Sequence, residues 1–157
     1  MSLNELLKEV ISEAKNLNIP VSDKIRSNVL TSNAQSFLGK CRKSGNSYTI
    51  YISNALLGGR DIQGIKQTLA HEILHTCDDC MNHGNTWKNY ANKMNKAYRY
   101  NISRTANAEA FNVVRTANYV VVCTQCGNKT YRSKKSKLIT HMHQYRCNCG
   151  GKLRLDS

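Results

Sequence analysis

The sequence lacks any apolar run near the ~18 residues that a membrane-spanning helix needs. Its first residues also lack the basic stretch followed by an apolar stretch that marks a secretory signal, so we do not expect export. Acidic residues are scarce in the second half, where residues 80–157 carry two acidic and fourteen basic side chains. We therefore expect a cytoplasmic protein that is nucleoid-associated, or nuclear in a eukaryotic host.

The positive charge is large and unevenly placed. The formal net charge is +13, and residues 1–79 are close to balance with nine basic and eight acidic side chains. Nearly all of the excess therefore lies in residues 80–157. A basic cluster of this kind favours a polyanionic partner, above all nucleic acid, bound in a salt-sensitive and sequence-independent way. The alternative is a basic surface that has no specific partner.

Seven cysteines are present in a chain of 157 residues. This length suffices for one domain with its own core and a small additional module. In a reducing compartment, cysteines in this number indicate metal ligation rather than disulfides.

The segment Thr68–Trp87 contains the pattern His-Glu-x-x-His, formed by His71, Glu72 and His75. Two histidines four apart on a helix lie on one side of it, one turn apart, so both can reach one zinc ion. Glu72 is then placed to take a proton from the attacking water as the catalytic base. A catalytic zinc takes three protein ligands, and His83 is the candidate for the third.

The hydrophobic periodicity around the pattern favours this interpretation. At 100° per residue, four apolar residues form one stripe that predicts the buried face: Ile62, Ile65, Leu69 and Ile73. His71 and His75 fall on the opposite side of the helix, and Asp61 is a candidate N-cap. The alternative is a chance occurrence of a five-residue pattern on a solvated helix face.

The residues before this segment predict scaffold elements. A helix is expected over Ser2–Leu17, which begins with a capping box of Ser2 and Glu5, and a second short helix over Ser22–Leu30. Two strand-like runs, Ser36–Arg42 and Ser47–Ile52, flank a turn and predict a hairpin.

This hairpin has two possible roles. The edge of a strand beside the metal helix can hold an extended peptide by main-chain hydrogen bonds. Equally, the hairpin can serve only to close the core. Cys41 lies in it and is expected to be a small buried hydrophobe.

The residues after the pattern predict a second helix from about Asn85, whose apolar stripe from Trp87 to Tyr98 is expected in the core. Asn101–Asn118 is polar and is expected to link two modules. Cys77 and Cys80 form a Cys-x-x-Cys pair without a second pair nearby, so we expect no metal there, although one of them remains an alternative ligand.

Residues 119–157 carry a second metal signature. Cys123 and Cys126 form one knuckle, and Cys147 and Cys149 form another with twenty residues between the two. This spacing predicts a structural zinc held by four cysteines, with short strands around it. The second knuckle is Cys-x-Cys, one residue shorter than usual, and His141 or His143 is an alternative ligand. Eight basic residues against one acidic, with Tyr131 available for stacking, favour nucleic-acid contact here.

The order of hairpin, Leu-Ala-His71-Glu72-x-x-His75, His83-Gly-x-x-Trp87-Lys and four-cysteine ribbon resembles the SprT-like, Spartan-related metallopeptidases. The resemblance implies an α+β fold: a zincin-like domain of helices and a small antiparallel sheet over residues 1–118, with 101–118 as linker, and a β zinc ribbon over 119–157. It implies a catalytic zinc on the three histidines, with Glu72 as base, and a structural zinc on the four cysteines. It also implies endopeptidase activity on proteins that are associated with DNA or crosslinked to it.

Other functions remain open from the residues alone. One is a nucleic-acid-binding zinc protein whose metallopeptidase-like domain is not catalytic, although a purely structural site would not need Glu72. Another is a different zinc hydrolase, such as a deformylase, with Cys41 as an upstream ligand. Tyr98, Tyr100 and Arg104 are candidates for stabilising the oxyanion.

Overall fold

The computed structural model describes residues 1–105, 111, 113 and 117–156, and the chain divides into two compact units, Met1–Val114 and Arg115–Ser157. The predicted linker over Asn101–Asn118 falls partly outside the described residues. Two residues of that stretch, Ile102 and Phe111, are buried in the core of the first unit. Within the described ranges, no helix has the length and apolar character needed to cross a membrane.

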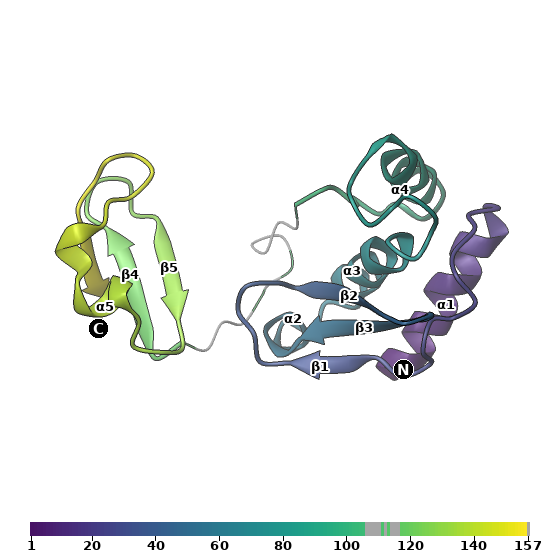
Figure 1. Ribbon diagram of the computed structural model, residues 1–157, viewed down its shortest axis with the longest axis horizontal. Helices are drawn as coiled ribbons and strands as arrows, with labels where there is room; N and C mark the ends of the chain where they lie inside the picture. The colour runs from purple at the N-terminus through teal and green to yellow at the C-terminus, as the bar shows by residue number, and fades with distance from the viewer. Residues whose placement is uncertain (106–110, 112, 114–116, 157) are drawn as a thin grey trace. The chain divides into compact units, whose positions relative to one another are not determined.

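The fold is of the α+β class, as predicted. The elements of the first unit are α1 Leu3–Asn16, β1 Leu30–Ser32, β2 Gly39–Ser44, β3 Ser47–Ser53, α2 Asn54–Gly58, α3 Ile62–Leu74 and α4 Asn85–Tyr98 (Figure 1). Those of the second unit are β4 Tyr119–Cys123, β5 Lys129–Arg132, α5 Lys137–Thr140, the 3-10 turn η2 Met142–Gln144 and β6 Leu153–Asp156.

Helix α1 begins and ends where its sequence predicts. The side chain of Ser2 accepts a hydrogen bond from the main chain of Glu5, while the Glu5 carboxylate accepts one from the main chain of Ser2. This reciprocal pair satisfies two N–H groups that the first turn leaves unpaired. The apolar side of the helix is buried at Leu6, Leu7, Val10 and Ala14.

The helix predicted over Ser22–Leu30 is absent, and that prediction was wrong. The segment instead runs along the edge of β3: Arg26 donates to the carbonyl of Tyr48, and Tyr48 donates to the carbonyl of Lys24. It then continues into β1. Its main-chain groups are paired through contacts distant in sequence, which local helical periodicity does not register.

The three strands of the first unit form one sheet in the order β1-β3-β2. β2 and β3 form the predicted antiparallel hairpin, closed by a two-residue turn between Ser44 and Ser47 in which Gly45 has φ +58°. β1 was not predicted, and it pairs with β3 in parallel. Since no described strand pairs with the outer side of β2, that strand is an edge of the sheet.

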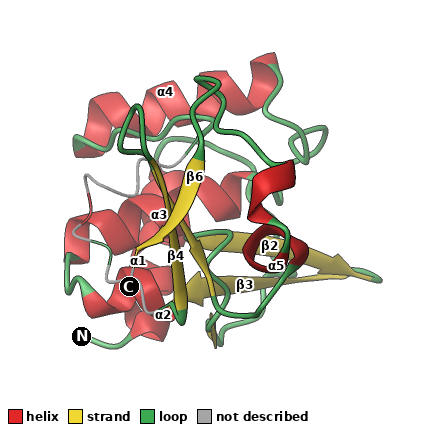
Figure 2. Ribbon diagram, turned by 90° about the vertical axis from the view of Figure 1, so that its left-hand side faces the viewer, coloured by secondary structure: helices red, strands yellow, loops and turns green. Residues whose placement is uncertain are grey.

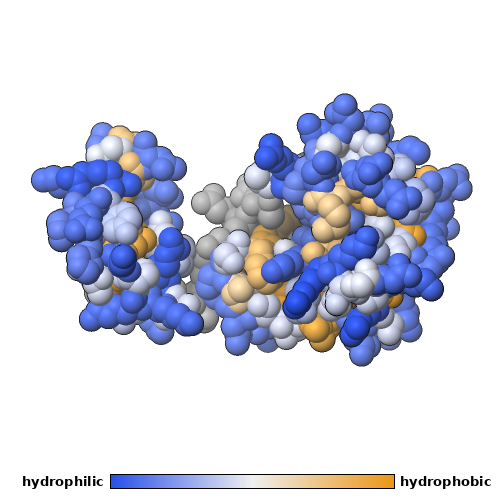
Figure 3. All heavy atoms as spheres, viewed as in Figure 1, coloured by the Kyte–Doolittle hydropathy of each residue, from blue (hydrophilic) through white to orange (hydrophobic). Residues whose placement is uncertain are grey.

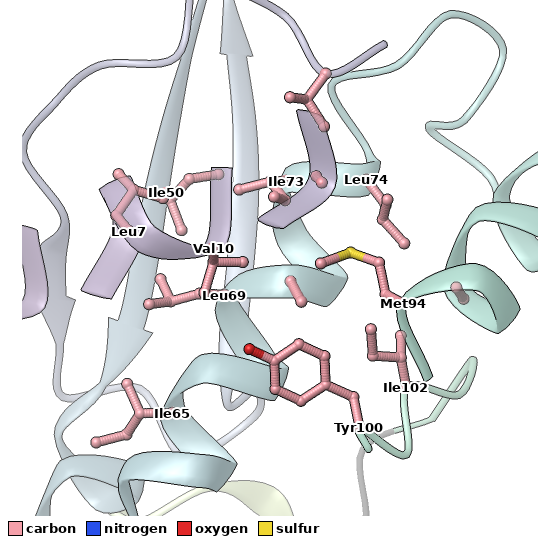
Figure 4. Close-up of a cluster of buried hydrophobic side chains, with 14 of the residues drawn as sticks. Leu7, Val10, Ile50, Ile65, Leu69, Ile73, Leu74, Met94, Tyr100 and Ile102 are labelled. Carbon is pink, nitrogen blue, oxygen red and sulfur yellow. The ribbon is translucent and has the colours of Figure 1, made fainter. Parts of the chain in front are cut away.

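Helix α3 packs against β2 and β3, and α1 packs against α3 (Figures 1 and 2). Ile65, Leu69 and Ile73 are buried as predicted, whereas Ile62, in the first turn, is 50% exposed, so the buried stripe begins one turn later. Figure 4 shows the cluster in which these side chains meet Ile50 of β3. Burying each such side chain contributes about 1.5–3 kcal/mol, which fixes α3 against the sheet.

In the second unit, β5, β4 and β6 form an antiparallel sheet in that order. These strands match the three short strands that the sequence predicts around the knuckles. Val121 and Val122 of the central strand β4 are buried. Hydrophilic residues cover most of the face of this unit that Figure 3 shows, consistent with its eight basic residues.

Candidate metal centres

Helix α3 carries the first two histidines at its C-terminal end. The Asp61 side chain caps the helix by accepting a hydrogen bond from the N–H of Gly64, as predicted. The helix ends at Leu74, and His75 is its C-cap. The buried stripe holds one side of the helix in the core, so His71 and His75 emerge together on the other side.

The chain after α3 turns tightly and returns His83 to this side. The N–H of Cys80 donates to the carbonyl of Cys77, and Asp79 has φ +56° in this turn. The carbonyl of Cys80 lies 2.6 Å from Nδ1 of His75. A donor at Nδ1 leaves Nε2 of His75 unprotonated, which is the form that binds a metal.

The three imidazoles converge. The ligand atoms of His71, His75 and His83 all lie within 4.8 Å of one another, and Nε2 of His71 is 3.1 Å from Nε2 of His83. Two nitrogens bound at 2.0–2.1 Å to a tetrahedral zinc are about 3.3 Å apart. The donor set and its spacing therefore fit a zinc ion.

Trp87 of α4 packs against all three imidazoles. Its ring centroid lies 4.8 Å from that of His71, 5.8 Å from that of His75 and 4.6 Å from that of His83. The Trp87 side chain is 1% exposed. Rings packed in this way hold their orientations, so Trp87 keeps the three histidines in place for a common ligand.

The environment of the histidines favours their neutral forms. Burial lowers the pKa of His71 to about 4, with further lowering from His75 and His83. Burial also lowers the pKa of His75 and of His83. Because zinc binds neutral imidazole, no proton has to be displaced near neutral pH.

The side chain of Glu72, on α3, lies against the edge strand β2. Its side chain is buried, and the main-chain N–H of Cys41 donates a hydrogen bond to the carboxylate. Burial raises the pKa of Glu72 to about 8, although the bond from Cys41 acts in the opposite direction. The space for the carboxylate exists because position 39 is glycine: a Cβ on Gly39 would lie 2.9 Å from Oε1 of Glu72.

Two of the three oxyanion candidates have other partners. The hydroxyl of Tyr100 donates to the Glu13 carboxylate over 2.6 Å, and that of Tyr98 donates to the Glu13 carbonyl over 3.1 Å. Both tyrosines therefore tie the end of α4 to α1. Because both hydroxyl protons are donated to Glu13, the two tyrosines are not oxyanion donors in this structure.

The four ribbon cysteines also converge. Sγ of Cys123 is 3.5 Å from Sγ of Cys149, and Sγ of Cys126 is 3.6 Å from Sγ of Cys147. Sulfurs bound to a tetrahedral zinc at about 2.3 Å are about 3.8 Å apart, whereas a disulfide requires about 2.05 Å. The spacing fits a metal rather than a disulfide, and the short Cys-x-Cys knuckle closes the set.

Main-chain amides face the ribbon sulfurs. The N–H groups of Gln125 and Cys126 donate to Sγ of Cys123, and these bonds lower the pKa of the Cys123 thiol to about 6. Thiolates are the form that binds zinc. Gly151 makes room for them, since a Cβ there would lie 2.4 Å from Sγ of Cys123.

The other metal-ligand candidates lie outside both clusters in the described part of the chain. Cys41, Cys77 and Cys80 are absent from the two groups of metal-binding side chains, and so are His141 and His143. Cys77 and Cys80 are buried in the turn, where they shape the path to His83. No ligand role follows for any of these residues.

A model of the SprT-like family matches residues 5–107. The chain belongs to the SprT-like family. The match covers His71, Glu72, His75 and His83 but ends before the four ribbon cysteines. A comparison with curated proteins gave no match. The domain is therefore metallopeptidase-like.

Sequence reasoning missed the residues that support Glu72. The contribution of Gly39 and of the Cys41 main chain depends on where β2 crosses α3, which no local pattern gives. A glycine inside a strand was the available signal, because such glycines often mark a close approach of another group.

Proposed function

We propose that this SprT-like protein is a zinc-dependent endopeptidase that acts on proteins associated with DNA or crosslinked to it. The observation that carries the proposal is the convergence of three neutral histidines beside a buried glutamate. A structural zinc site needs no such carboxylate, whereas peptide hydrolysis requires a base for the attacking water.

In this proposal His71, His75 and His83 hold the zinc ion, which supplies Lewis acidity toward the scissile carbonyl and the attacking water. Glu72 takes the proton of the water at its carboxylate and returns it to the leaving amine. Burial raises the pKa of Glu72, which makes its carboxylate a stronger base than an exposed one. The bond from Cys41 keeps the carboxylate oriented.

The substrate is proposed to lie along β2 in extended form. Leu38, just before β2, accepts a hydrogen bond from the main chain of Ser53. The main-chain N–H and C=O groups of the even-numbered residues of β2 therefore point toward β3. The main-chain groups of Gly39, Cys41 and Lys43 therefore point to the open side. A peptide added there as a further strand would run past Glu72, which already receives the Cys41 N–H.

DNA is proposed as the partner of the basic half. Lys134, Lys135 and Lys137 are exposed on the second unit between the knuckles. Lysines in such a cluster bind phosphates without reading sequence. Cysteine thiolates that bind a metal are typical of a reducing compartment. We therefore propose that the protein works in the cytoplasm, at the nucleoid or in a nucleus.

The decisive experiment compares Glu72→Gln with His75→Ala in the purified zinc-loaded protein. Glu72→Gln should keep both zinc ions and lose cleavage of a protein crosslinked to DNA, whereas His75→Ala should lose one zinc ion and cleavage together. Full cleavage by Glu72→Gln would contradict the assigned base. A wild-type protein that binds DNA yet cleaves nothing, with or without single-stranded DNA, would support a non-catalytic binding protein instead.

A separate triple variant tests the proposed binding of DNA by the ribbon. Replacing Lys134, Lys135 and Lys137 with glutamate should weaken DNA binding and reduce its dependence on salt. Lys8, Lys15 and Lys24, in the balanced half, give the matched triple replacement. Equal DNA affinity of the two triple variants would contradict the assignment of DNA to the ribbon.

A further inference from the structure

The sheet of the first unit has one face that α3 covers and one face turned away from it. A Cβ at Gly39 of β2 would touch Glu72 of α3, and Ile50 of β3 is 0% exposed, so these positions face the helix. Side chains alternate along a strand, so Arg42 of β2 and Tyr51 of β3 point to the other face, here called the outer face. Arg42 is exposed there, and Tyr51 is half-buried.

The segment before β1 adds a second arginine to the outer face. Ile25 forms a parallel bridge with Tyr48 and packs against the core. Its neighbour Arg26 is exposed and therefore points to the outer face, beside Thr49. Thr49 pairs with Arg42 on its other side, so the two arginines flank it from neighbouring strands. Adjacent strands lie about 4.8 Å apart, which places the two arginine Cα atoms about 10 Å from each other.

These two arginines have no acidic partner in the described part of the chain. The ion pairs of the first unit engage lysines of α1 and α3, and neither Arg26 nor Arg42 takes part in one among the described residues. Between Asp23 and Asp61 the sequence has six basic residues and no acidic one. The near balance of residues 1–79 therefore conceals a positive sheet, because the acidic residues of that half lie before and after it.

An aromatic side chain lies on the same face as the two arginines. Tyr51 is flanked by Leu30 of β1, which is 44% exposed, and by Lys40 of β2. The ammonium of Lys40 lies over the Phe37 ring, 5.9 Å from its centre. Cations beside an aromatic ring are typical of surfaces on which the bases of a single strand stack while the cations contact its phosphates.

We propose that the outer face of this sheet is a second nucleic-acid site, separate from the ribbon, which binds one strand of DNA through Arg26, Arg42 and Tyr51. A guanidinium keeps its charge and offers paired N–H donors that match two phosphate oxygens. Two such groups on Cα atoms about 10 Å apart contact different phosphates of one strand, while a base stacks on Tyr51. An acidic peptide matches the charge of the face but has no base to stack on the ring.

The position of the outer face also defines a substrate class, and this step rests on the proposed peptidase function. A peptide added to the open edge of β2 alternates its side chains between the α3 face and the outer face. A nucleotide crosslinked to a side chain of the second kind emerges beside Arg42. The outer face therefore favours a peptide that carries a single DNA strand over the same peptide without it.

The first test measures binding of a fluorescent poly-dT oligonucleotide to the full-length, zinc-loaded protein. Arg26→Gln combined with Arg42→Gln should weaken binding on the order of 10-fold and reduce its salt dependence. The slope of log Kd against log salt should fall by about 1.4, since each phosphate contact with a single strand contributes about 0.7. Lys8→Gln with Lys15→Gln removes two exposed cations from α1 of the same unit and should change neither value.

A further variant separates stacking from charge. Tyr51→Leu should weaken binding on the order of 10-fold without changing the salt slope, because loss of stacking releases no counterions. Equal affinity and slope in the arginine variant and the lysine control would overturn the site. Wild-type affinity in Tyr51→Leu would contradict the stacking of a base. Polyglutamate that binds as tightly as the oligonucleotide, and loses as much in the arginine variant, would assign the face to acidic proteins instead.

The second test compares cleavage of a peptide crosslinked to poly-dT with cleavage of the same peptide alone. The wild type should show the higher kcat/KM on the crosslinked peptide, and the arginine variant should reduce that preference on the order of 10-fold, in line with its loss of affinity. An undiminished preference in the arginine variant would overturn the substrate class. A wild type that cleaves neither peptide would overturn the peptidase function without affecting the result of the binding measurement.

Discussion

Gly39 of β2 stands against the carboxylate of Glu72, with no room for a side chain between them. A Cβ at position 39 would lie 2.9 Å from both Oε1 and Cγ of Glu72 and 2.6 Å from Cγ2 of Thr68. The edge strand β2 thus approaches α3 as closely as the two backbones allow. The same strand supplies the Cys41 N–H that orients the carboxylate.

Gly39→Ala should therefore displace Glu72 or push β2 away from α3. We expect cleavage to fall at least ~10-fold, because small displacements of a catalytic group are costly, while zinc at the histidines is retained. The overpacking should also cost about 1–3 kcal/mol of stability. Lys40→Ala, an exposed neighbour on β2, is the control for changes in the strand itself. An alanine variant with wild-type turnover would show that the close approach has no catalytic importance.

The two metal centres should be separable. We expect two zinc ions per chain by elemental analysis, with His83→Ala losing one and Cys126→Ala losing the other. The second variant should also unfold residues 115–157, since so small a unit has too little core to fold without a metal. Loss of both ions in either variant would mean that the two sites depend on each other.

Trp87 should report on zinc at the histidines. It is the single tryptophan of the chain and lies against all three imidazole rings. Adding zinc to the metal-free protein should change its emission, and His75→Ala should abolish that response. Cys126→Ala should leave it intact, because the ribbon cysteines belong to the other compact unit and form a separate metal cluster. An emission that ignores zinc would argue against binding of the ion at the histidines.

Glu72→Gln should stabilise the metal-free protein, and more so at higher pH. Burial raises the folded-state pKa of Glu72 from 4.5 to about 8. The charge of this carboxyl therefore costs no stability below pH 4.5, and the free energy of unfolding falls as the pH rises from 4.5 through 8. Glutamine avoids this cost and still accepts the Cys41 N–H. We expect a gain of at most about 4 kcal/mol at pH 8 and under ~1 kcal/mol at pH 5.

Urea unfolding followed by Trp87 emission, in the presence of a chelator, measures this difference. Asp78→Asn neutralises an exposed carboxylate in the following turn and should show no comparable gain. A gain of the same size at pH 5 and pH 8 would assign it to packing rather than to the buried charge. The wild-type residue would then carry no electrostatic cost.

The sequence predicted the parts of the site that depend on local spacing. His71, Glu72 and His75 follow from helical geometry, and the Asp61 cap follows from its position before the helix. The four ribbon cysteines lie together as their spacing suggested. Each of these predictions needed only the distance along the chain, which secondary structure converts directly into distance in space.

The parts that the sequence did not predict depend on contacts between distant segments. The helix expected over Ser22–Leu30 does not form because the main chain of Lys24 and Arg26 pairs with Tyr48 of β3. Gln67 of α3 and Asn95 of α4 hydrogen-bond to the main chain of Asn101 and Ile102. Predicting these bonds would have required knowing that both helices lie beside this segment. Amide side chains in a polar stretch carry no pattern that separates such a role from simple solvation.

The charge of β2 bears on how the protein behaves at high concentration. An exposed sheet edge invites pairing with an identical edge, which is how many β proteins aggregate. Here the six residues Gly39–Ser44 include three cations, Lys40, Arg42 and Lys43. Two copies aligned edge to edge would bring these like charges together and would therefore repel each other. Raising the ionic strength should weaken that protection, and replacing the three cations with alanine should yield dimers or aggregates.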